Sequence, residues 1–207
     1  STKGRRLHVP GKYDEAIKCC DRAREVDPHG ALGWNHEGLI LASEERHEEA
    51  VHAFDKALEI DPLNAGAWSN MGISLTNLGR SDEALRSYDT ALELEPGATL
   101  VWYNKGLLLR EMGRHEEAIA SCDKVLEIDP QYSMAWYGKA LDLETVGRKE
   151  EAAESYRRFI ELGPAEYPEQ LAYSQQRFVE LGGKPAEKPE GKSPKSEHRR
   201  KSSSAAR

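Results

Sequence analysis

Cysteine is scarce in this chain of 207 residues, which contains only three. Three thiols are too few for a disulfide framework, and their spacing matches no metal-ligand motif. Cys20 and Cys122 fall on the apolar face of a helical pattern, and free cysteine is commonly buried. We therefore predict that these two are small core side chains, while Cys19 belongs to another helix face.

Long apolar runs are also missing. No stretch reaches the length needed to span a bilayer, and the first residues carry no signal-peptide pattern. We therefore expect a soluble cytoplasmic protein with no membrane partner.

The usual motifs of catalysis are absent as well. The sequence has no Gly-rich phosphate loop, no HExxH helix and no nucleophile elbow. Its histidines are scattered, and paired acids such as Glu48 and Glu49 stand where a helix begins, a position that the helix dipole favours. We predict that the chain is not an enzyme and has no catalytic residue, no metal site and no cofactor.

Positive charge is low outside the C-terminal end. The whole chain carries 29 Lys or Arg and 36 Asp or Glu, a net charge of −7. The segment 184–207 holds eight of the bases and three of the acids, so the remaining body carries 21 − 33 = −12. An acidic body argues against a nucleic-acid partner, because such binding depends on positive charge.

What the sequence does contain is a repeat. Within Ala65–Ala98, one apolar ladder runs through Trp68, Met71 and Leu75, and a second follows Gly79 before Pro96 ends it. The same pattern returns at an interval of 34 residues, which is typical of a helical repeat array. The tryptophans mark the interval: Trp34, Trp68, Trp102 and Trp136.

This pattern resembles the tetratricopeptide repeat (TPR) family over roughly residues 3–164. The resemblance implies an all-α fold, a right-handed α-solenoid of stacked antiparallel helix pairs. Some positions depart from the family pattern. Glu37, Lys105 and Lys139 replace a large apolar residue, and Glu45 replaces the glycine that ends the first helix in the other copies.

The residues of one copy explain its two helices. Gly72 has no side chain, so the partner helix can approach closely, and Gly79 suits the left-handed position just past a helix end. Ser81 is a candidate N-cap for the second helix. Pro96 stops that helix because proline cannot continue the backbone hydrogen bonds.

The sequence predicts these segments in order: a partial repeat over 1–30; full repeats over 31–64, 65–98, 99–132 and 133–164; a C-terminal capping helix over 165–182; and a disordered basic tail over 183–207. The partial repeat lacks half of its first helix, so we expect a piece of a longer array that can self-associate through its incomplete edge. A native start with a frayed first segment is the alternative. In the tail, His198–Lys201 matches a nuclear address or a contact for an acidic surface, Arg199–Ser202 resembles a basophilic kinase site, and Ser193-Pro194 resembles a proline-directed one. The simpler interpretation is a solvating tail.

The resemblance implies that first helices line a concave face where ligands lie. We predict a partner-binding groove, with aliphatic residues flanked by hydroxyl and amide groups: Asn35, His36, Leu39, Ser69, Asn70, Ile73, Tyr103, Asn104, Leu107, Tyr137 and Leu141. The competing interpretation is that the aliphatic residues pack between neighbouring first helices as core. Some family members use a clamp of Lys and Asn for a C-terminal carboxylate, and these repeats lack its cations.

The function that follows is an interaction scaffold or adaptor, which binds an apolar or amphipathic peptide or helix of a partner protein. Two alternatives remain. The repeats could be a regulatory or substrate-selecting array of a larger enzyme, or they could bind RNA, which the acidic body disfavours.

Overall fold

Helices form every regular element over residues 30–183, the part of the chain that this computed structural model describes. They are α2 (Ala31–Ser43), α3 (His47–Ile60), α4 (Ala65–Asn77), α5 (Ser81–Leu94), α6 (Thr99–Glu111), α7 (His115–Ile128), α8 (Ser133–Thr145), α9 (Lys149–Leu162) and α10 (Pro168–Glu180). The predicted partial repeat over 1–30, the basic tail, Cys19 and Cys20 lie outside this range, apart from Gly30 and Gly183.

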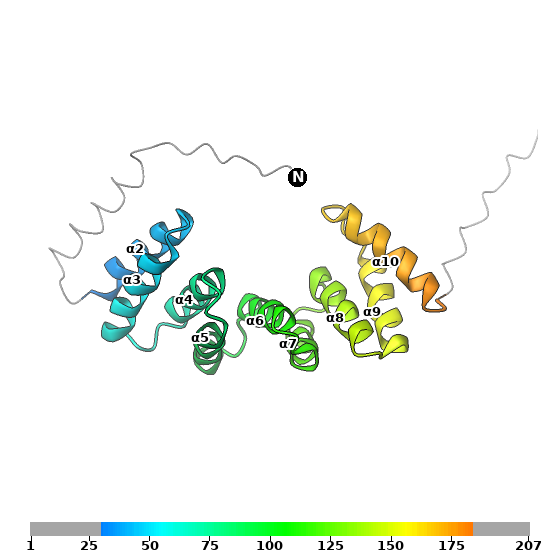
Figure 1. Cartoon of the computed structure of the whole chain (residues 1–207), viewed down its shortest axis with the longest axis horizontal. Helices are drawn as coiled ribbons and strands as arrows, with labels where there is room; N and C mark the ends of the chain where they lie inside the picture. Colours follow the sequence, from blue (N-terminus) through cyan, green and yellow to red (C-terminus); the bar gives the residue numbers. More distant parts are fainter. Residues whose placement is uncertain (1–29, 184–207) are drawn as a thin grey trace, which may run out of the picture.

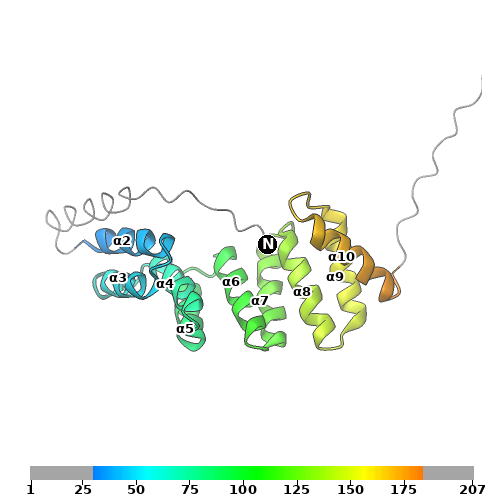
Figure 2. The same ribbon diagram turned by 45° about the horizontal axis from the view of Figure 1, so that its top comes forward.

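The helices stack as antiparallel pairs into a curved solenoid, which confirms the expected fold class. Each first helix packs against its second helix, and each second helix packs against the first helix of the next pair. Figure 1 shows α2, α4, α6 and α8 along the inner side of the arc and α3, α5 and α7 along the outer side. Turned by 45°, the chain keeps the same order, with α8, α9 and α10 side by side at one end (Figure 2).

A glycine and an aromatic ring fix the spacing within the first two helix pairs. A β-carbon built on Gly72 would lie 2.7 Å from the ring of Tyr88, and one built on Gly38 would lie 2.6 Å from the ring of Phe54. Both rings are buried, as are the alanines that open the inner face of each second helix, such as Ala84. The rings therefore fill the space that a side chain on the first helix would take.

The turn between the two helices of a pair uses a left-handed residue. Gly79, Gly113 and Gly147 have φ values of 72°, 74° and 82°, as the sequence predicts. The prediction that Ser81 caps the next helix is wrong by one residue, because α5 begins at Ser81 and its N-cap is Arg80. Arg80 instead bonds through its guanidinium to Glu83, at the third helical position.

The first copy makes the same turn without a glycine. Glu45 has a φ of 62°, and the amide of Arg46 bonds to the carbonyl of Leu41 as the amide of Arg80 bonds to that of Leu75. A side chain in the left-handed region costs about 1–2 kcal/mol.

Glu45→Gly is therefore expected to stabilise the chain by about 0.5–1 kcal/mol, since the strain relieved exceeds the added freedom of the unfolded chain. Urea unfolding followed by circular dichroism measures the change. Gly79→Ala, at the equivalent turn, is the matched control and should lower stability. The same sign for both variants would contradict the strain argument.

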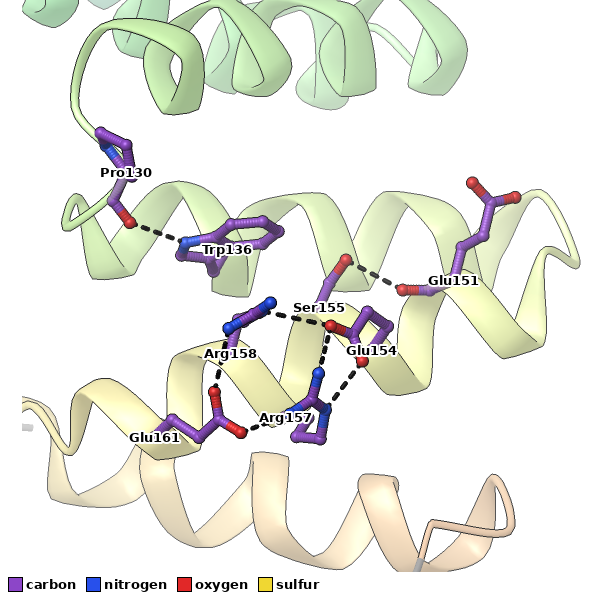
Figure 3. Close-up of polar contacts among 8 residues, drawn as sticks. All are labelled: Pro130, Trp136, Glu151, Glu154, Ser155, Arg157, Arg158 and Glu161. Carbon is purple, nitrogen blue, oxygen red and sulfur yellow. Dashed lines mark hydrogen bonds and ion pairs between the residues drawn. The ribbon is translucent and has the colours of Figure 1, made fainter.

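The tryptophans connect consecutive pairs. The indole Nε1 of Trp68, Trp102 and Trp136 donates to the carbonyl of the proline six residues earlier, at 2.9, 2.9 and 3.0 Å. Figure 3 shows this bond from Trp136 to Pro130. Each indole thus holds the loop that leads into its own helix, and each is partly buried.

Helix α10 covers the C-terminal end of the stack. The Tyr173 ring lies 6.3 Å from the ring of Tyr156 and 6.4 Å from that of Tyr137. Phe178 and Leu181 pack against the same cluster. On its exposed face, α9 carries ion pairs of Arg157 and Arg158 with Glu154 and Glu161 (Figure 3).

Candidate functional site

The predicted groove residues lie on the four first helices, and these helices line the inner side of the arc (Figure 1). Leu39, Ile73, Leu107 and Leu141 occupy one position on α2, α4, α6 and α8, and each of these helices contacts the next. Of the whole set, His36 and Leu39 are exposed, and the others are partly buried. The structure thus brings the set together as a row that is half accessible.

The C-terminal end of this row is covered by packing. Tyr137 and Leu141 pack against the buried cluster that contains Tyr156, and Phe178 of α10 packs against the same cluster. The Tyr137 ring also lies 5.3 Å from that of Phe159. At this end the contacts agree with the packing interpretation of the row.

The middle and the N-terminal part are more open. Ile73 packs against the core of the first repeats, and Leu39 remains 41% exposed. Tyr103 packs on Tyr132 at 5.1 Å, and burial raises the pKa of Tyr103 to about 12. The Oδ1 of Asn35 is buried and has no hydrogen-bond partner among the described residues.

A buried ionic cluster, which the sequence analysis did not predict, lies between α6, α7 and α8. The Asp142 carboxylate is 1% exposed. It accepts hydrogen bonds from Arg110 Nε at 2.9 Å and Arg110 Nη2 at 2.7 Å, and it lies 2.9 Å from His115 Nδ1. Burial opposes the charge on Arg110, but the hydrogen bonds and the charge of Asp142 outweigh it and raise the pKa of Arg110.

Two small residues make room for the cluster. A β-carbon on Gly138 would lie 2.6 Å from Arg110 Nη2. Cys122 stands at the position that Tyr88 and Tyr156 fill with rings in the neighbouring repeats. A sequence signal was present, since Asp142 occupies the register of the buried Leu108.

A second ionic link continues toward the C-terminal helix. Glu144 accepts a hydrogen bond from the Tyr156 hydroxyl at 3.0 Å and pairs with Arg177 of α10. Together the two links join α6, α8 and α10 along the inner side, where the sequence predicted only an apolar stripe with polar flanks.

The Cys122 thiol is poorly suited to act as a nucleophile. Cys122 is 2% exposed, and burial raises the pKa of its thiol to about 12, so the reactive thiolate is scarce at neutral pH. Within residues 30–183, no group of three or more His, Cys, Asp or Glu side chains is placed to hold a metal ion. In the same range no helix has the length and apolarity to cross a membrane.

Comparison with known proteins agrees with this geometry. Two family profiles, both described as tetratricopeptide repeat, match residues 4–65 and 70–133 in one case and 53–86 in the other. No curated protein sequence matches the chain.

Solved structures extend the likeness to the fold. MamA has 22% identity and a TM-score of 0.70, covering 73% of this chain and 89% of its own. A MamA fragment from Desulfovibrio magneticus RS-1 has 19% identity and a TM-score of 0.62, with 73% and 93% covered. YrrB, described as a TPR protein with an unusual peptide-binding site, has 24% identity and a TM-score of 0.69, with 79% and 84% covered.

Proposed function

The chain belongs to the tetratricopeptide repeat family, and on that premise we propose that it is a non-catalytic scaffold that binds a partner protein along its first helices. The partner segment is an extended peptide or helix with apolar side chains. YrrB, which shares the fold, is described as binding a peptide. A cytoplasmic location is part of the same proposal.

One observation carries the proposal: the aliphatic row on the inner side stays accessible at its open end. Leu39 is 41% exposed, and Ile73 and Leu107 are partly buried on the next first helices. Ser69 and Asn104 stand beside the row, partly exposed, and can hydrogen-bond a peptide backbone. An apolar strip with such flanks suits peptide recognition.

The groove is tested by selecting peptides and then changing the row. The intact chain is immobilised and panned against a random peptide library. Enriched peptides are then measured by fluorescence polarisation against the double variant Leu39→Asp/Leu107→Asp. Two carboxylates in an apolar contact should weaken binding by about a hundredfold or more, while circular dichroism remains helical.

The matched control places the same change on another surface. Ile60 and Leu94 lie in the last turns of α3 and α5 and are 40% and 36% exposed, close to the exposure of Leu39. Ile60→Asp/Leu94→Asp should bind the selected peptides as the unchanged chain does. The proposal would be overturned if both double variants lost affinity for the selected peptides equally, or if panning enriched no peptide.

A further inference from the structure

Two junctions between repeats are held by a lysine in the same way. Lys105 Nζ lies 2.5 Å from Asp89 Oδ1 and 5.2 Å from the centre of the Trp102 ring. Lys139 Nζ lies 2.6 Å from Asp123 Oδ1 and 5.7 Å from the Trp136 ring. In each case the lysine and the indole come from one first helix, and the aspartate comes from the preceding second helix.

The junction between α3 and α4 has the aspartate and the indole but no lysine. Asp55 and Trp68 stand at the equivalent positions, and Met71 replaces the lysine. Met71 is neutral and 8% exposed. Asp55 is exposed and forms no hydrogen bond or ion pair within residues 30–183; the nearby Lys56 interacts with it electrostatically but forms its ion pair with Glu59. At this junction, therefore, no lysine of the following first helix pairs with the aspartate and lies over the indole.

A cavity accompanies this difference. It measures about 620 Å³, and Val51, Trp68 and Met71 give it an apolar wall while Glu48 and Asp55 add acidic groups. We call it the junction pocket. The corresponding cavity at the next junction, which Lys105 and Asp89 line, measures about 330 Å³.

The basic groups around the junction pocket leave Asp55 accessible. Arg80 is occupied by Glu83, with Nη2 and Oε2 2.5 Å apart. Arg86 and His52 also line the pocket, and both are exposed. None of the three makes an ion pair with Asp55 within residues 30–183.

We propose that the junction pocket binds a lysine side chain from a basic segment of a partner protein. Its alkyl stem lies against Val51 and Met71, because lysine buries its methylene groups while its charge stays in water. Its ammonium pairs with Asp55 and lies over Trp68, as Lys105 does at the next junction. This site uses residues of α3, α4 and α5 that are distinct from the peptide row, so it goes beyond the scaffold proposed above.

The four tryptophans provide a direct readout. Nα-acetyl-lysine methylamide is titrated into the ¹⁵N-labelled full chain, and the indole N–H resonances are followed by NMR. The Trp68 resonance should shift and saturate. The resonances of Trp102 and Trp136 should stay unchanged, because Lys105 and Lys139 already lie over these rings. The same probe acetylated at Nε should have no such effect, because it carries no charge.

Two variants and a control complete the test. Met71→Lys supplies the missing ammonium within the chain and should abolish the Trp68 shift. Asp55→Asn should weaken binding by about five- to tenfold, since a charged hydrogen bond is lost. Glu93→Gln removes the same charge from an exposed site of α5 outside the pocket and should change nothing. Equal shifts of all indoles, equal binding of the neutral probe, or unchanged binding by Met71→Lys would each overturn the proposal.

Discussion

Arg110→Met is expected to lower the free energy of unfolding by about 3 kcal/mol, because it leaves a buried carboxylate without its guanidinium partner. Asp142 is 1% exposed and takes three of its close contacts from Arg110, at 2.7–3.1 Å. With methionine in its place, only His115 remains beside the charge. Urea unfolding measured by circular dichroism gives the change.

The double variant Arg110→Met/Asp142→Leu should recover most of this loss. Replacing a buried ion pair by apolar groups of similar size is often neutral or stabilising, and Leu108 already fills the register of Asp142 one repeat earlier. Arg114→Met breaks an exposed pair with Glu117 and serves as the control, with little expected effect. A double variant as unstable as the single one would mean that the ionic link itself, and not the unpaired charge, determines stability here.

Gly72→Ala is expected to cost about 1–2 kcal/mol, even though alanine favours a helix more than glycine does. The added β-carbon would lie 2.7 Å from Tyr88 Cε1 and 2.8 Å from Cδ1. Tyr88 is 1% exposed and cannot move away without disturbing the pair α4 and α5. Thermal and urea unfolding measure the loss.

Gly106→Ala is the matched control, because the third repeat has a smaller residue across the pair. Its β-carbon would lie 3.3 Å from Ser121 Cβ and 3.9 Å from Cys122 Sγ. We expect a much smaller loss than for Gly72→Ala, since the contact at 3.3 Å needs only a small shift and the helix gains from alanine. A loss as large as that of Gly72→Ala would show that the glycine matters for backbone reasons and not for the ring.

Local chemistry explains how far the sequence predicted the turns. Positive φ values occur at Gly79, Gly113 and Gly147 because the turn requires them. Each glycine can be recognised from its own place in the repeat, so the turns were predictable from single residues. The start of α5 was misplaced by one residue, since Arg80 bonds to Glu83 through its side chain while Ser81 enters the helix. The exact first residue of a helix depends on which side-chain hydrogen bonds form there, and residue propensities alone do not determine this.

The sequence predicted which positions of the repeat form the candidate groove, but not how accessible their side chains are. The repeat interval places Leu39, Leu107 and Leu141 at one position of successive helices. How much of each is accessible depends on the neighbouring elements, and Leu141 packs against the buried cluster that also receives Phe178 of α10. Asp142 was missed for the same reason, because its partners lie 27 and 32 residues away in the chain.

By itself, then, the sequence determined the helical repeat, its interval of 34 residues and the position at which each helix pair turns, because these follow from apolar periodicity and from single residues such as Gly79. Only the tertiary structure decided that Arg110 reaches Asp142, that Tyr173 of α10 contacts Tyr137, and that Lys105 pairs with Asp89 of the preceding repeat. These depend on side chains of different repeats meeting across a junction, and such distances are set by the stacking of whole helix pairs.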